Sequence, residues 1–161
     1  MDTKNWPAMQ QTKFTTILWG AGLVSLALGM AVYLACRSEP PFLIFLWTNH
    51  NNLYDCGGIE VMNSMPSALH AVGFTCLLGA SLGGTRLALI VSGIFWFTTN
   101  ALWEWACNVN FPWPHIRRQV VEWFLIQPGL VHACTSDLTD VFAAAVGAAL
   151  PIALHIAFVS R

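Results

Sequence analysis

Charged residues are scarce in this sequence of 161 amino acids: they make up 9% of it, whereas hydrophobic residues make up 56%. A typical soluble domain has roughly 25% charged residues. So few charges cannot cover a surface that faces water on all sides, so the composition argues against a soluble domain and favours a membrane protein. The formal net charge of −1 leaves no basic excess, which argues against nucleic acid as a partner.

Sequence motifs for metal binding are also missing. The five cysteines form no CxxC pair, and no HExxH occurs. We therefore expect no metal and no cofactor, and the sequence favours a role without catalysis. Cys76 lies deep in an apolar segment and is interpreted as a core residue. The other four cysteines fall near segment ends on one predicted side, where they could form a disulfide if that side is oxidising: Cys36, Cys56, Cys107 and Cys134.

Four apolar segments are long enough to cross a bilayer, which takes about 20 mostly apolar residues. They cover residues 14–35, 67–85, 87–107 and 138–159. Two shorter apolar stretches, 42–47 and 120–126, are predicted to be interfacial or re-entrant. No linker or repeat divides the chain. The predicted fold is a single all-α membrane domain over residues 1–161, with four transmembrane helices.

The N-terminal segment resembles a signal sequence, because Lys4 and Lys13 precede a long apolar run. The run is longer than an ordinary signal core, and Tyr33 does not fit a lipoprotein cleavage site, so we expect an uncleaved helix. Four crossings place both termini on the same side. The basic residues divide four to three in favour of cytoplasmic termini: Lys4, Lys13, Arg86 and Arg161 inside, and Arg37, Arg117 and Arg118 outside.

Polar residues gather near the outer ends of three predicted helices. His70 lies about one turn into the second helix. Asn100 and Glu104 share a face of the third, as do Asp137 and Asp140 at the start of the fourth. An ionisable side chain that faces lipid near mid-bilayer costs about 2.5–3.5 kcal/mol, so these side chains should turn inward. We predict that all five residues line one polar pocket.

Simpler structural roles exist for several of these residues. Asp137 follows Thr135 and Ser136, where an acidic residue caps a helix N-terminus and interacts favourably with the helix dipole. For His70, the alternative is a purely structural role, in which it forms a hydrogen bond to a neighbouring helix. Asp140 lies a turn deeper, so capping explains it less well.

The segment from Asn63 to Leu150 resembles the VanZ-like membrane proteins. The resemblance is carried by Asn63-Ser64-Met65-Pro66-Ser67-Ala68-Leu69-His70, by Leu87–Asn108 with Trp103-Glu104-Trp105, and by Thr135-Ser136-Asp137-Leu138-Thr139-Asp140. That family has a histidine opening one helix, a glutamate closing the next and an aspartate opening the last. The resemblance implies that His70, Glu104 and either Asp137 or Asp140 are functional. Two features depart from the family: the glutamine after the glutamate is absent, and Thr135-Ser136 replaces the arginine before the aspartate.

The resemblance implies a multi-pass protein of the bacterial inner membrane whose polar pocket, at the outer face, binds or acts on an envelope component. The founding member of the family is linked to low-level teicoplanin resistance. The alternative is an accessory subunit of a larger membrane complex, since small residues recur every fourth position and allow helices to pack closely. These faces are Ala21/Ser25/Gly29, Thr75/Gly79/Gly83 and Ala143/Gly147. Membrane lipids are the expected partners in either case. A hydrolase or metal enzyme using His70, Glu104 and Asp140 has the weakest support.

Overall fold

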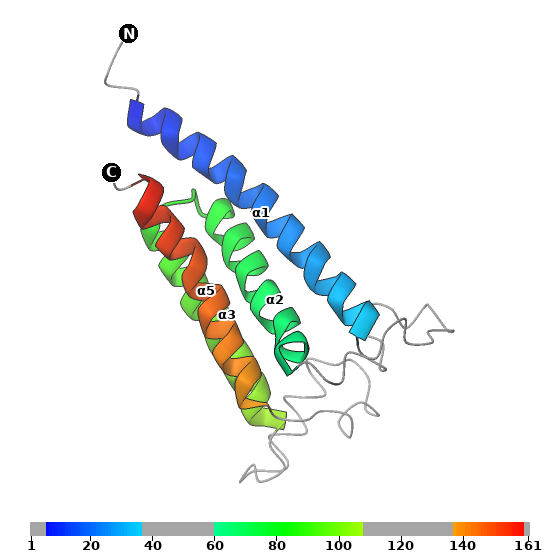
Figure 1. The fold of residues 1–161 in the computed structure, drawn as a ribbon. Coiled ribbons are helices and arrows are strands. Elements are labelled where there is room, and N and C mark those ends of the chain that lie inside the picture. The colour runs from blue at the N-terminus through cyan, green and yellow to red at the C-terminus, as the bar shows by residue number, and fades with distance from the viewer. Residues whose placement is uncertain (1–5, 37–59, 108–136, 160–161) are drawn as a thin grey trace.

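The computed structural model describes residues 6–36, 60–107 and 137–159. These residues form four helices: α1 (Trp6–Cys36), α2 (Glu60–Ser81), α3 (Arg86–Cys107) and α5 (Leu138–Val159). No strand occurs within these ranges. In Figure 1, α2 lies between α1 and the pair formed by α3 and α5, and the start of α1 lies at the same end of the bundle as the end of α5.

Three of the helices are long and apolar enough to cross a membrane. Their apolar parts are Gln11–Val32, Arg86–Trp105 and Leu138–Ala157. The prediction of an all-α protein with membrane-spanning helices is therefore confirmed for α1, α3 and α5. The more polar α2 is not among them, and the two short stretches 42–47 and 120–126 lie outside the described residues.

The predicted helix starts were wrong for α1 and α2. Helix α1 begins at Trp6 rather than residue 14, because the polar residues before the apolar run are also helical. Helix α2 begins at Glu60 rather than residue 67, so Pro66 lies inside it instead of at its start. A proline there removes a backbone hydrogen bond and costs about 3 kcal/mol in an isolated helix. Burial of the Pro66 ring, which is almost completely inaccessible, offsets part of that cost.

The turn between α2 and α3 follows a helix-ending pattern. The N–H of Gly84 donates to the carbonyl of Gly79 at 2.8 Å, and the N–H of Gly83 donates to that of Ala80 at 3.0 Å. These are the two hydrogen bonds of a Schellman motif, which needs a left-handed residue that glycine adopts readily. Gly83 has φ +94°. Thr85 then caps α3, because its Oγ1 accepts a hydrogen bond from the N–H of Ala88 at 3.2 Å.

Glycines allow the helix backbones to approach closely. A Cβ on Gly22 of α1 would lie 3.0 Å from the carbonyl oxygen of Gly73 in α2, and a Cβ on Gly147 of α5 would clash with the backbone of Ala68 in α2. Small residues therefore form the contact faces, as expected for membrane helices. In α1 the close contact is made by Gly22, whereas Ala21 of the expected small-residue face is exposed in the single chain.

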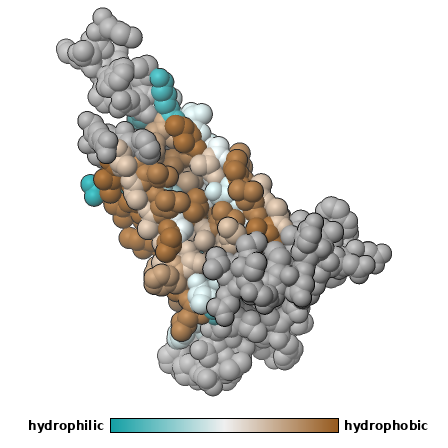
Figure 2. Space-filling model, viewed as in Figure 1, coloured by the Kyte–Doolittle hydropathy of each residue, from teal (hydrophilic) through white to brown (hydrophobic). Residues whose placement is uncertain are grey.

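The outer faces of the bundle are apolar. Figure 2 shows hydrophobic residues covering the visible side of the helices. Large side chains such as Ile17 of α1, Leu87 of α3 and Phe142 of α5 are mostly exposed, while a small core forms between α1, α2 and α3 around Leu18, Cys76 and Leu89. A surface of large apolar side chains around a small core suits helices that are surrounded by lipid rather than water.

Candidate functional site

Glu104 joins α3 to α5 at the end of the bundle where α3 ends and α2 and α5 begin. Its Oε2 accepts a hydrogen bond of 2.8 Å from the backbone N–H of Asp137, the residue just before α5. The side chain of Glu104 is only 9% exposed. Because a buried carboxylate needs hydrogen-bond donors, this contact explains how Glu104 is tolerated near the end of an apolar helix.

Asp137 caps the N-terminus of α5. Its Oδ1 accepts hydrogen bonds from the backbone N–H of Thr139 at 2.8 Å and from the Thr139 hydroxyl at 2.7 Å. The first of these satisfies a backbone donor that the helix itself leaves unpaired. The capping role expected for Asp137 is therefore confirmed.

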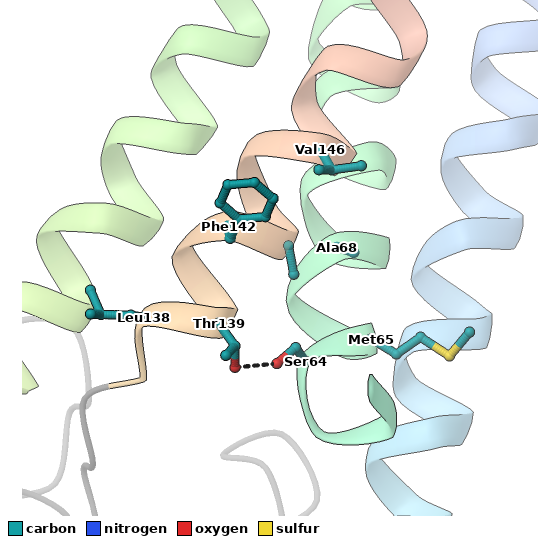
Figure 3. Close-up of a pocket in the computed structure, with 8 residues that line it drawn as sticks. Ser64, Met65, Ala68, Leu138, Thr139, Phe142 and Val146 are labelled. Carbon is teal, nitrogen blue, oxygen red and sulfur yellow. Dashed lines mark hydrogen bonds between the residues drawn. The ribbon is translucent and has the colours of Figure 1, made fainter. Parts of the chain in front are cut away.

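Two hydroxyl groups extend this polar chain from α5 to α2. The Thr139 Oγ1 lies 2.7 Å from Ser64 Oγ, and Figure 3 shows the two side chains pointing toward one another. The Thr139 hydroxyl has one proton, which it gives to the Asp137 carboxylate, so Ser64 must be the donor to Thr139. A single polar chain thus runs from Glu104 through Asp137 and Thr139 to Ser64.

An apolar groove opens beside Ser64 and Thr139, between α2 and α5. Its volume is about 580 Å³. The residues that line it are Ser64, Met65, Ala68, Leu138, Thr139, Phe142, Ala143 and Val146. The side chains of Phe142 and Val146 are 75% and 59% exposed, so the groove opens to the outside of the bundle. The arrangement therefore combines a polar end with apolar walls, as binding sites for small ligands often do.

The other predicted pocket residues, His70, Asn100 and Asp140, lie on α2, α3 and α5. His70 faces α1, because a Cβ on Gly29 would lie 3.3 Å from its Cδ2. Asn100 donates to the carbonyl of Trp96 on its own helix at 2.9 Å, and Asp140 is buried. The described contacts thus bring Glu104 and Asp137 together. A single pocket that includes His70, Asn100 and Asp140 remains a prediction.

Sequence reasoning missed three polar residues. Ser64 and Thr139 line the groove, and their only sequence signal was the position of Thr139 two residues after a predicted cap. His155 was not among the predicted site residues; it is only 6% exposed, and its ring packs edge-on against Phe14, with ring centroids 5.0 Å apart. Within the described part of the chain, neither ring nitrogen of His155 has a hydrogen-bond partner.

The structure gives no support to hydrolase or metal chemistry in the residues it describes. The segment Gly79–Gly83 has the Gly-x-Ser-x-Gly spacing of hydrolase nucleophiles. However, its Ser81 lies in the last turn of a helix and donates to the carbonyl of Leu77 at 2.8 Å, whereas those nucleophiles occupy a strand-to-helix turn. No group of three or more His, Cys, Asp or Glu that could hold a metal occurs among the described residues.

The predicted disulfide involves cysteines whose side chains lie outside what the structure describes. Cys56 and Cys134, and the side chains of Cys36 and Cys107, are outside what the structure describes. Cys76 is buried and free, as expected for a core residue.

Comparison of the chain with protein-family models, with curated proteins and with solved structures found no match.

Proposed function

We propose that this chain is a VanZ-like protein of the bacterial inner membrane that binds an envelope component at the outer end of its helices. The observation that carries the proposal is the buried Glu104 carboxylate, which holds the start of α5 through the N–H of Asp137 beside an open groove. A carboxylate is costly in a membrane protein and usually marks a functional site.

The proposed topology includes α2 as a fourth crossing. Helix α2 packs against α1, α3 and α5, so it contacts protein on several sides. A helix in that position needs less apolar surface than one that faces lipid, which accounts for its more polar composition. Four crossings would leave both termini on one side. The division of Lys and Arg residues favours the cytoplasm for that side and the outer face for Glu104.

The proposed role in binding is supported by the way hydrogen bonds hold the polar atoms of the site in place. The Glu104 and Asp137 carboxylates accept hydrogen bonds from neighbouring groups, and the Ser64 and Thr139 hydroxyls are linked to each other. Such contacts fix the polar atoms in position. A site of this kind supplies a fixed pattern of charge and acceptors for recognition.

Glu104→Gln tests the proposal, because it removes the charge while leaving a carbonyl oxygen that can accept from Asp137. In a strain that lacks the chromosomal copy, we expect wild-type protein to restore resistance to a teicoplanin-type antibiotic and Glu104→Gln to lose it. Thr99→Val on the same helix is the matched control, since Thr99 is half-buried and its described hydrogen bond is to the carbonyl of Phe95 on its own helix.

Membrane fractions must contain equal amounts of the two variants and of wild type. Loss of resistance in Glu104→Gln with retention in Thr99→Val supports the proposal. Full resistance in a correctly inserted Glu104→Gln protein contradicts it.

A second candidate function is that of an accessory subunit in a larger membrane complex. Helix α1 packs mainly on α2, and its other sides expose large apolar side chains, including Trp19, Leu23 and Leu28. Such a surface can contact lipid or another membrane helix. Mild detergent extraction followed by native mass spectrometry separates the two functions: a fixed complex with other chains favours the subunit, and a free chain favours the first proposal.

A further inference from the structure

We infer that the groove between α2 and α5 binds a bilayer lipid whose head group carries a primary amine. This inference rests on the proposed function and names the class of its ligand. It is carried by three features of the described residues: the shape of the groove, the direction of its hydrogen bonds and the sign of the nearby charge.

The walls of the groove fit an acyl chain. Leu138, Phe142 and Val146 are spaced four residues apart and therefore line one face of α5 over about 12 Å. The small side chains of Ala68 and Ala143 leave the space between the two helices. None of the eight lining residues is charged, and the exposed Phe142 and Val146 place the opening on the side that lipid would cover.

The polar end of the groove offers hydrogen-bond acceptors. The Thr139 proton is given to Asp137, and the Ser64 proton is given to Thr139. Both hydroxyl protons are therefore used within the protein, and lone pairs remain on the two oxygens that line the groove. A ligand that bonds to these oxygens must supply the donors, as a primary ammonium group does with three N–H bonds.

Among the described residues, the charged side chains nearest this end are acidic. The Asp137 carboxylate lies 2.7 Å from the Thr139 hydroxyl, and the carboxylate of Glu104 lies 2.8 Å from the N–H of Asp137. The lysine and arginine within the described ranges, Lys13 and Arg86, lie at the opposite end of the bundle, where α1 and α3 begin. Because charges of opposite sign attract more strongly where water is excluded, this end favours an ammonium group over a phosphate or carboxylate.

The test measures lipid binding to the full chain, purified in detergent and stripped of lipid, by native mass spectrometry. Three lipids with identical acyl chains are compared: phosphatidylethanolamine, phosphatidylcholine and phosphatidylglycerol. Phosphatidylcholine has a cationic head group without N–H donors, and phosphatidylglycerol is anionic. We expect wild-type protein to bind phosphatidylethanolamine about tenfold more tightly than either of the others, which corresponds to about 1.4 kcal/mol.

Two variants distinguish recognition of the lipid head group from binding of its acyl chains. Asp137→Asn removes the charge but keeps an oxygen that caps α5 well, so it should abolish the preference for phosphatidylethanolamine. Val146→Trp fills the groove and should weaken binding of all three lipids about tenfold. Val91→Trp is its matched control, since Val91 is 51% exposed on α3 and lies outside the groove; it should bind as wild type does.

Equal affinity of wild type for the three lipids, or unchanged binding by Val146→Trp, overturns the inference. Because Val146 is exposed, its replacement should not disturb folding, which far-UV circular dichroism checks. The resistance assay on Glu104→Gln is independent of lipid binding in detergent. Lipid binding that shows no preference while Glu104→Gln still loses resistance would refute only the amine-lipid assignment. Selective lipid binding with full resistance in Glu104→Gln would refute only the proposed function.

Discussion

Replacing Gly147 by alanine should push α5 away from α2. A Cβ at this position would clash with the carbonyl oxygen of Ala68 and would lie 3.0 Å and 3.1 Å from that residue's carbonyl carbon and Cα. These atoms belong to a helix backbone, so they cannot rotate away as a side chain would. The two helices must therefore separate or shift, which would also alter the groove beside them.

The expected magnitude follows from two opposing effects. An alanine in place of a helical glycine stabilises the helix by about 1 kcal/mol. Overpacking a close contact costs about 1–3 kcal/mol, and a clash with backbone lies at the upper end of that range. We therefore expect Gly147→Ala to lower the free energy of unfolding by about 2 kcal/mol, the difference between these effects.

Gly20→Ala is the matched control, because a Cβ on Gly20 of α1 would have no atom within 4 Å. Its free energy of unfolding should rise by up to about 1 kcal/mol, because alanine favours the helix and no packing cost opposes it. Unfolding of both variants in mixed dodecylmaltoside and SDS micelles, followed by far-UV circular dichroism, measures the difference. A Gly147→Ala protein that is as stable as Gly20→Ala would refute the close approach of α2 and α5.

Two further substitutions test polar groups elsewhere in the bundle. His155→Phe should raise the free energy of unfolding in the same micelles by about 1 kcal/mol or more. The substitution removes a buried polar ring without hydrogen-bond partners in the described structure, and it keeps the edge-on contact with Phe14. A less stable protein would show that the imidazole has a partner. Thr85→Ala should lower the free energy of unfolding by about 1 kcal/mol, because α3 loses its cap. Thr85→Ser keeps the hydroxyl and should retain most of the wild-type stability. Equal stability of the two variants would contradict the capping role.

The polar residues show where sequence reasoning stopped. The spacing of Asn100 and Glu104 correctly placed them near the end of one helix, and the position of Asp137 correctly predicted a cap. Neither spacing nor composition could identify the contact between Glu104 and Asp137, because it is made by a backbone N–H just before another helix. The face that His70 presents was equally beyond prediction, since it depends on how α1 crosses α2.

The amino-acid sequence by itself determined that this chain is helical and apolar enough to enter a membrane, because both properties follow from the length and composition of single segments. Tertiary structure alone decided that Gly22 rather than Ala21 contacts α2, that Pro66 is buried within a helix, and that Ser64 meets Thr139 beside a groove. These features depend on the rotation and separation of neighbouring helices. Contacts between small residues fix this rotation and separation. The contacting residues lie far apart in the chain, so no local sequence pattern encodes the contacts.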